Sequence, residues 1–346
     1  MQYAHLGRTG VVVSRFCLGT MNFGWKTPED ESLAIMDAAI DQGVNFFDTA
    51  NVYGFQIGEG ITENIVGKWL AQGGRRDRIV LATKVYGPMG FGVNDRGLSA
   101  LHIRRACDES LRRLKTDRID VYYMHHIDRG ETQPSTRRLW KLPEVQLCRP
   151  PHCKLETPWE EIWQAMEVLI AQGKVLYVAS SNFAGWHIAQ ASEKAVQRNM
   201  LGLVAEQSLY NLNSRTVELE VLPACREYGM AVVPWSPLAA GLLGGIGDKQ
   251  ASGRRGAATE EIEKHRAKLE AYEAFCRELG ERPADVAIAW LLKNPVVTSP
   301  ILGPRTLDQL TGSLAALGVS LDDAAMGRLD EIFPGPGGKA PEAYAW

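Results

Sequence analysis

The sequence of 346 residues lacks a long hydrophobic run and a strong charge of either sign. No stretch of 18 or more apolar residues occurs, and the first eight residues lack the apolar segment of a signal peptide. The formal net charge is −3, from 38 basic and 41 acidic side chains, so nothing favours nucleic acid or an anionic membrane as a partner. We therefore expect a cytoplasmic protein whose partner is a small molecule.

Cysteine is also sparse: the chain has six, at positions 17, 107, 148, 153, 225 and 276. Their scatter does not form a disulfide framework, so we expect most of them to be reduced, buried thiols. Cys148, His152 and Cys153, which lie near His125 and His126 in the sequence, raise zinc binding as an alternative. The spacing of the two cysteines is loose and no second pair follows, so we predict no metal site.

The sequence does contain short β-branched or aromatic runs that alternate with longer amphipathic ones, which indicates repeated βα units. Parallel strands are expected to end near Gly19, Asp48, Lys84, His125, Ser180, Gln207, Trp235 and Leu302. Helices are expected over 28–42, 62–72, 99–115, 158–172, 186–198, 217–228 and 306–317, with two extra helices over 260–279 and 283–293. Charges alternate along the first extra helix, so we expect it to be a solvated outer face. Eight such strands close a barrel, and we predict a single α/β domain over 1–346 with the (β/α)8 TIM-barrel fold.

Three segments fall outside this repeat. Residues 3–6 and 11–13, joined by 7–10, predict an N-terminal β-hairpin. Residues 129–156, with prolines at 134, 143, 150 and 151, form a long insertion after the fourth strand. The proline- and glycine-rich tail over 333–346 is expected to be extended or mobile.

Four polar residues stand at or just past the ends of successive strands: Asp48, Tyr53, Lys84 and His125. In a barrel these ends converge on one face. A tyrosine phenol, with an ordinary pKa of about 10, becomes a better acid when a nearby lysine lowers that pKa. Asp48 would hold Lys84 charged, and neutral His125 would donate a second hydrogen bond, so the set can protonate a carbonyl oxygen. Taken singly, the residues have a structural alternative as a buried ion pair and a loop aromatic.

The stretches around these residues resemble the aldo-keto reductase family. The matching segments are 45–50 with Tyr53 and Gly54, Lys84, 110–125, 180–183, 206–211, 235–238 and 303–306, in order over nearly the whole chain. The resemblance implies a TIM barrel whose floor is plugged by the hairpin. It also implies NADPH-dependent reduction of an aldehyde or ketone, with Asp48, Tyr53, Lys84 and His125 as catalytic tetrad and Tyr53 as general acid.

The cofactor implied by the resemblance is NADPH, or NADP⁺ in its oxidised form. No Gly-x-Gly-x-x-Gly stands after an early strand, so a Rossmann site is not expected. By resemblance, Trp235 would stack on the nicotinamide ring while Ser181, Asn182 and Gln207 bond its carboxamide; for Trp235 the alternative is a core residue at the barrel rim. The full predicted set is Gly19, Thr20, Met21, Asp48, Ser181, Asn182, Gln207, Trp235, Ser236, Pro237, Leu238, Gly241, Leu242, Arg254, Gly303, Arg305, Gln309 and Ser313.

The phosphates of the cofactor are expected at two places. Backbone amides in the loop from Ser236 to Gly241 could bind the pyrophosphate, with Arg254 closing over it or simply solvated. Arg305, at a helix N-terminus, is the candidate for the adenosine 2′-phosphate. The chain departs from the family at Ser313, where relatives often carry an asparagine that contacts adenine.

Aromatic residues expected to line a substrate pocket are Phe23, Trp25, Tyr86 and Trp140, together with His126. Strand alternation predicts that His126 faces away from His125. Two alternative functions stay open. The chain could be a cofactor-binding regulatory module, resembling the potassium-channel β subunits that keep this fold, or a reductase of a nucleotide-linked keto sugar, whose diphosphate the basic insertion could bind. The oligomeric state is left open.

Overall fold

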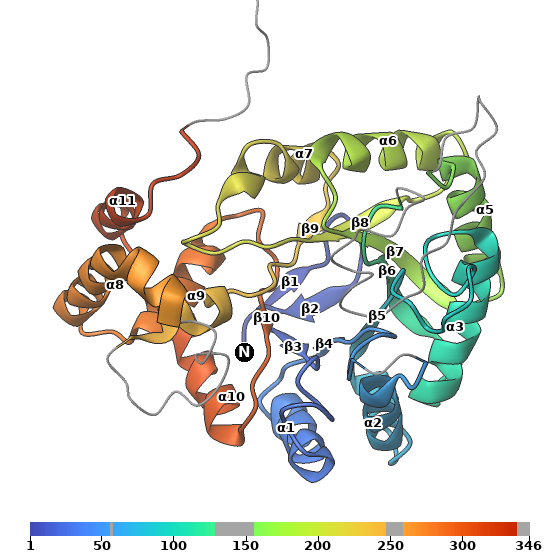
Figure 1. Ribbon diagram of the computed structural model, residues 1–346, viewed down its shortest axis with the longest axis horizontal. Helices are drawn as coiled ribbons and strands as arrows, with labels where there is room; N and C mark the ends of the chain where they lie inside the picture. Colours follow the sequence, from blue (N-terminus) through green and yellow to red (C-terminus); the bar gives the residue numbers. More distant parts are fainter. Residues whose placement is uncertain (56–57, 129–155, 247–258, 338–346) are drawn as a thin grey trace, which may run out of the picture.

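The computed structural model describes residues 1–55, 58–128, 156–246 and 259–337. Eight parallel strands form one sheet in the order β10, β3, β4, β5, β6, β7, β8, β9, and helices surround them (Figure 1). The strands are β3 (Cys17–Gly19), β4 (Phe46–Asp48), β5 (Val80–Val85), β6 (Ile119–Met124), β7 (Val175–Ser181), β8 (Leu203–Gln207), β9 (Ala231–Val232) and β10 (Ile301–Leu302). The predicted α/β barrel is confirmed. Predicted and observed strand ends agree within one residue except at β9, which ends at Val232 rather than near Trp235.

The barrel closes between β9 and the residues that lead into β10. Val232 forms a parallel bridge with Val297. The Thr298 N–H donates to the Val232 carbonyl at 2.8 Å, and the Ile301 N–H donates to the Pro234 carbonyl at 2.8 Å. Both β9 and β10 are only two residues long. We call this junction the seam; single bridges and isolated hydrogen bonds hold it.

An antiparallel hairpin, β1 (Tyr3–His5) and β2 (Val12–Ser14), covers the floor of the barrel, as predicted. The Ser14 N–H donates to the Asn45 side chain just before β4, and the Arg8 N–H donates to the Gly229 carbonyl just before β9. Leu6 and Val13 are fully buried. They pack with the side chains that fill the barrel interior: Cys17, Phe46, Ala82, Val121, Tyr123, Ala179, Val204 and Ala231.

The outer ring consists of helices that agree with the predicted ones to within a few residues. They are α1 (Glu29–Asp41), α2 (Ile61–Leu70), α3 (Ala100–Leu114), α5 (Trp159–Ala171), α6 (Gly185–Val196), α7 (Val221–Glu227) and α10 (Leu307–Leu314), with the extra helices α8 (Thr259–Leu279) and α9 (Pro283–Lys293). Four short 3₁₀ helices are also present in the described residues: η1 (Arg76–Arg78), η2 (Thr216–Glu218), η3 (Ala239–Gly244) and η5 (Ala315–Gly318).

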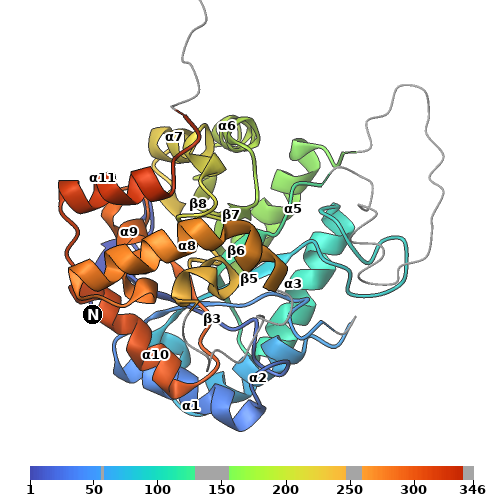
Figure 2. The same cartoon turned by 60° about the vertical axis from the view of Figure 1, so that its left-hand side comes forward.

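Two predictions at the C-terminal end are corrected. A further helix, α11 (Asp323–Ile332), was not expected, and it lies beside α8 (Figure 2). Helix α8 is not a wholly solvated face, because Tyr272 and Cys276 on it are buried. Phe333 is 1% exposed and packs edge-on against Tyr272, with ring centroids 5.4 Å apart, so the extended tail cannot begin at this residue. Residues 338–346 and the insertion 129–155 lie outside the described residues.

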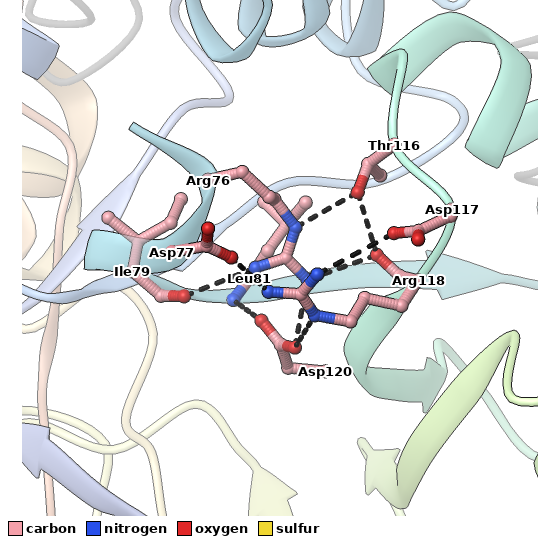
Figure 3. A network of polar contacts seen from close by, with 8 residues as sticks. All are labelled: Arg76, Asp77, Ile79, Leu81, Thr116, Asp117, Arg118 and Asp120. Atoms are coloured by element: carbon pink, nitrogen blue, oxygen red, sulfur yellow. Dashed lines mark hydrogen bonds and ion pairs between the residues drawn. The ribbon is translucent and has the colours of Figure 1, made fainter. Parts of the chain in front are cut away.

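A polar network ties the starts of β5 and β6 together (Figure 3). The Asp120 carboxylate accepts the Leu81 N–H at 2.7 Å and the Arg76 guanidinium at 2.8 Å. Arg118 approaches the same carboxylate at 3.7 Å and pairs with Asp77 at 2.7 Å. The network therefore fixes β5, which carries Lys84, against β6, which leads to His125.

Cys17, Cys107, Cys225 and Cys276 are free and buried, as expected of reduced thiols. Cys148, His152 and Cys153 lie outside the described residues, and within those residues no cluster of metal-ligating side chains occurs. No helix in the described part of the chain is long and apolar enough to span a membrane.

Candidate active site

Three of the four predicted catalytic residues meet around one ammonium group. The Nζ of Lys84 donates to Oδ2 of Asp48 at 2.6 Å, to Oη of Tyr53 at 3.0 Å and to the carbonyl oxygen of Thr49 at 2.8 Å. The side chains of Lys84 and Asp48 are 0% and 2% exposed, whereas Tyr53 is partly exposed. His125 follows β6, and its ring stands edge-on to that of Tyr53 with centroids 6.0 Å apart. The structure thus brings the tetrad together.

Strand register and one glycine explain this arrangement. Asp48 is paired with Ala82 across β4 and β5, so Lys84, two residues further along β5, points to the same face nearer the mouth. Tyr53 sits in a turn closed by its N–H and the Ala50 carbonyl at 3.1 Å. Gly54 has φ +97°, and a Cβ there would lie 2.6 Å from the Ile61 Cβ. Only glycine allows this turn to deliver the Tyr53 hydroxyl to Lys84.

Burial and the charge of the partner have opposite effects on the pKa of each member of the ion pair. Burial raises the pKa of Asp48, and the charge and hydrogen bond of Lys84 only partly offset it. For Lys84 burial acts to lower the pKa, but Asp48 and Tyr53 together outweigh it, so the pKa is raised. Lys84 therefore carries its charge at neutral pH.

The pKa of Tyr53 corrects an expectation from the sequence. Burial raises the pKa of the phenol above its ordinary value, and the opposing effect of Lys84 is smaller. The Asp48 carboxylate adds to the effect of burial, because a nearby negative charge disfavours the phenolate and so raises the pKa of Tyr53. Tyr53 is therefore protonated at neutral pH and holds a proton it can donate.

The two histidines differ from prediction in one respect. Burial and the Lys84 charge hold the pKa of His125 well below its ordinary value, so its ring is neutral, as expected. His126 does not face away from it: the two rings are nearly parallel, with centroids 5.5 Å apart. Strand β6 ends at Met124, so alternation does not extend to these residues. The ring of His126 also lies 5.5 Å from that of Tyr86.

Two of the other residues predicted to line the substrate pocket, Phe23 and Trp25, lie in different surroundings. Phe23 is fully buried in the cluster between the barrel and α1 and α2, so its side chain belongs to the core. Trp25 is 44% exposed and packs edge-on against Phe55 at 4.8 Å. Trp140 lies outside the described residues.

A group of neutral polar side chains continues the site along β7 and β8. Gln207 donates from Nε2 to Oδ1 of Asp48 at 2.7 Å. Asn182 donates from Nδ2 to the His125 carbonyl at 3.1 Å and accepts the Trp235 indole N–H at 3.1 Å. The Ser181 hydroxyl donates to the Gln207 carbonyl at 2.9 Å. We call Ser181, Asn182 and Gln207 the amide shelf; it contacts both the tetrad and the partly exposed Trp235.

The shelf rests on a buried residue that sequence reasoning missed. Glu206 is fully buried beside Gln207 and accepts hydrogen bonds from Ser180, Ser208 and the Phe183 N–H. Burial raises the pKa of its carboxyl to about 7. Glu206 begins the matching segment 206–211 and follows the apolar start of β8, Leu203-Val204-Ala205, but neither signal assigned it a role.

The remaining predicted cofactor residues lie at three strand ends. After β3, a Cβ on Gly19 would lie 2.4 Å from the Ile301 side chain, Thr20 donates to the Asp48 carbonyl at 3.0 Å, and Met21 is partly buried. After β9, Ser236 (φ +55°) starts a loop in which Ala239, Ala240 and Gly241 also have positive φ. Pro237 is buried there, and Leu238 and Leu242 pack against the core. Arg254 lies outside the described residues.

The third group follows β10. Gly303 accepts a hydrogen bond from the Asn22 side chain at 2.9 Å. The Gln309 side chain accepts the Arg305 N–H at 2.8 Å, and the Ser313 hydroxyl donates to the Gln309 carbonyl at 2.8 Å. Arg305 is partly exposed at the start of α10. The hydroxyl of Ser313 is thus engaged by its own helix.

Comparison with known proteins of similar sequence identifies the family of this chain. The profile of the aldo/keto reductase family matches residues 15–333. An uncharacterized oxidoreductase of Bacillus subtilis, YrpG, is 52% identical over the full length of both chains. A probable voltage-gated potassium channel subunit beta of rice is 34% identical over 92% of both chains. A norsolorinic acid reductase of Emericella nidulans is 32% identical over 94% of this chain and 79% of its own. The chain therefore belongs to the aldo/keto reductase family of oxidoreductases.

Proposed function

We propose that this protein reduces an aldehyde or ketone to an alcohol with NADPH, and that Tyr53 is the general acid. The observation that carries the proposal is the buried Lys84 ammonium, which contacts Asp48 and Tyr53 at hydrogen-bond distance. A charged lysine beside a protonated phenol stabilises the phenolate that forms when the proton leaves. This is the arrangement that a carbonyl reduction requires.

The four residues divide the work on the carbonyl oxygen. Tyr53 transfers its proton to the oxygen as the C=O double bond becomes a single bond. Lys84 stabilises the resulting phenolate, and Asp48 keeps Lys84 charged and in place. Neutral His125 donates a second hydrogen bond to the oxygen as negative charge develops on it. NADPH, when bound, supplies the hydride that the carbonyl carbon receives.

The residues present fit such a cofactor. The amide shelf offers neutral donors and acceptors, which are the complement of a carboxamide, and Trp235 presents a partly exposed ring fixed by Asn182. The Ser236–Gly241 loop offers backbone amides for the pyrophosphate. Arg305, at the start of α10, suits the 2′-phosphate that distinguishes NADPH from NADH.

The direct test is turnover. Purified protein should oxidise NADPH, followed by its near-ultraviolet absorbance, when reactive aldehydes such as nitrobenzaldehyde are added. Consumption of NADPH should match the alcohol formed. A broad panel of aldehydes and ketones that leaves NADPH unchanged would contradict the proposal.

A cofactor-binding regulatory subunit is the second candidate, favoured by the similarity to a probable potassium channel subunit beta. The presence of all four tetrad residues in contact argues against it, because a sensor needs no acid aimed at a substrate. Tight NADPH binding without turnover on the same panel would favour this function instead.

A further inference from the structure

We propose that Glu206 is a positioning residue that holds Ser181 and Asn182 in the conformation that receives the nicotinamide carboxamide. The inference rests on the proposed cofactor and extends it to a residue that touches neither cofactor nor substrate. Three features carry it: the position of the Glu206 carboxyl between two strand ends, the backbone conformation of Asn182, and the neutral character of the donors that the described residues offer to the carboxyl.

The carboxyl bonds to groups on both sides of the shelf. Its Oε2 accepts the Ser180 hydroxyl at 2.5 Å, and its Oε1 accepts the Phe183 N–H at 3.1 Å. Ser180 and Phe183 are the residues immediately before and after Ser181 and Asn182. Oε1 also accepts the Ser208 hydroxyl at 2.8 Å, just past Gln207. One carboxyl group thus fixes the flanks of all three shelf residues.

These hydrogen bonds lie at a point where the pairing of β7 with β8 is irregular. The register of β7 against β8 shifts between Val178 and Ser180, and Ser180 is the residue paired with Glu206. Asn182 has φ +61°, a left-handed conformation that residues with a side chain seldom adopt. The hydrogen bond from the next N–H, that of Phe183, holds this conformation. Asn182 can then contact the His125 carbonyl and the Trp235 indole.

A purely structural carboxylate would be expected to pair with a cation. Glu63, the other fully buried glutamate in the described chain, pairs with Arg113 at 2.7 Å. The donors to Glu206 among the described residues, which include the hydroxyls of Ser180 and Ser208 and the Phe183 N–H, are neutral. Burying a carboxyl among neutral donors costs free energy. Glu206 incurs this cost beside the residues that flank the amide shelf.

The test compares the binding of two ligands that share the adenosine end of the cofactor. NADP⁺ carries the nicotinamide, and adenosine 2′,5′-bisphosphate carries only the adenosine end. Their dissociation constants are measured by calorimetry for the wild type, Glu206→Gln and Ser180→Ala. Asp120→Asn is the matched control, since it alters a carboxylate that is also buried but lies among Arg76, Arg118 and the Leu81 N–H at the start of β6.

Glu206→Gln should raise the Kd for NADP⁺ about tenfold, the worth of a hydrogen bond to a charged group, and leave the Kd for the bisphosphate unchanged. Ser180→Ala removes one donor and should shift only NADP⁺, by a smaller factor, so it serves if Glu206→Gln fails to fold. Asp120→Asn should change neither constant. Equal effects on both ligands, or none on either, would overturn the role of Glu206. A wild type that binds neither ligand would overturn the proposed cofactor, and the role of Glu206 with it.

Discussion

Tyr53 is the residue on which the proposed chemistry depends. Its hydroxyl lies 3.0 Å from Lys84 Nζ, and burial keeps it protonated at neutral pH. Tyr53→Phe removes the acid and keeps the ring. We expect turnover with NADPH to fall by about 10²–10⁴-fold, the usual contribution of a positioned acid, while the Kd for NADP⁺ stays the same.

Steady-state kinetics and cofactor titration on the same preparation check this prediction. Because Tyr53 makes a single hydrogen bond to Lys84 and keeps its aromatic contacts in the Phe variant, folding should be preserved and can be verified by circular dichroism. Turnover equal to that of the wild type would show that the proton comes from another group.

Glu206 gives the stability of the protein a pH dependence. Its pKa is about 7 in the folded protein against an ordinary value of 4.5. Between these values the folded state binds more protons than the unfolded state, so the stability due to this residue falls as pH rises. We expect the wild type to lose more thermal stability than Glu206→Gln between pH values of about 5 and 8.

Melting temperatures of the two proteins at both pH values test this sign. The pKa of Asp48 is also raised, and that of His125 is lowered, but both residues are common to the two proteins and cancel in the comparison. Equal losses in the two proteins would show that Glu206 is ionised well below neutrality in the folded state.

At the scale of elements, the junction of β5 and β6 depends on Asp120. Asp120→Ala would leave Arg76 and the Leu81 N–H without their shared acceptor. Because the Arg76 and Asp120 side chains are largely buried, little water can replace the lost carboxylate. Breaking a buried pair costs about 3–5 kcal/mol, and we expect a loss in this range. Urea unfolding curves measure it.

Asp77 supplies the matched control within the same network. It pairs with Arg118, but its side chain is 79% exposed, and exposed pairs contribute about 0–1 kcal/mol. Asp77→Ala should therefore shift the urea midpoint little. Equal shifts for the two variants would mean that burial does not decide the contribution of this network.

The elements with clear periodicity could be predicted from the sequence, and those without it could not. Apolar runs that end in a polar residue marked the strands and, with them, the tetrad. Helix α11 was missed because only Ala325 and Leu329 on it are buried and Gly327, a poor helix former, lies in its middle. The orientation of His126 depended on where β6 ends, a property of the sheet. The raised pKa of Tyr53 depended on burial by residues distant in sequence.

At the scale of the molecule, we propose that the chain unfolds as one domain to which the cofactor is coupled. A ligand that binds only the folded state at a hundred times its Kd adds about 2.7 kcal/mol to stability. NADPH at that excess should raise the free energy of unfolding by this amount and so raise the single unfolding temperature. The same concentration of NADH should raise it less, because NADH has no 2′-phosphate for Arg305.

Differential scanning calorimetry with NADPH and with NADH, each at the same concentration, makes the measurement. Two separate transitions would contradict the single domain. Equal shifts by the two cofactors would contradict the role of Arg305 and leave the rest of the site unaffected.

The seam is the part of the barrel at which we expect local unfolding to begin. Strand β9 and the residues leading into β10 share one bridge and scattered hydrogen bonds, so local unfolding should begin there. The amides of Thr298 and Ile301 should exchange with solvent before those of β5 and β6. Trp235 and Gly303, on either side of the proposed cofactor, follow the two strands that meet at this junction. A dinucleotide that contacts both residues would link the two sides of the seam and slow its local unfolding. Slower amide exchange at the seam would then show that the cofactor site is occupied, although this site lies at the opposite end of the barrel from the hairpin.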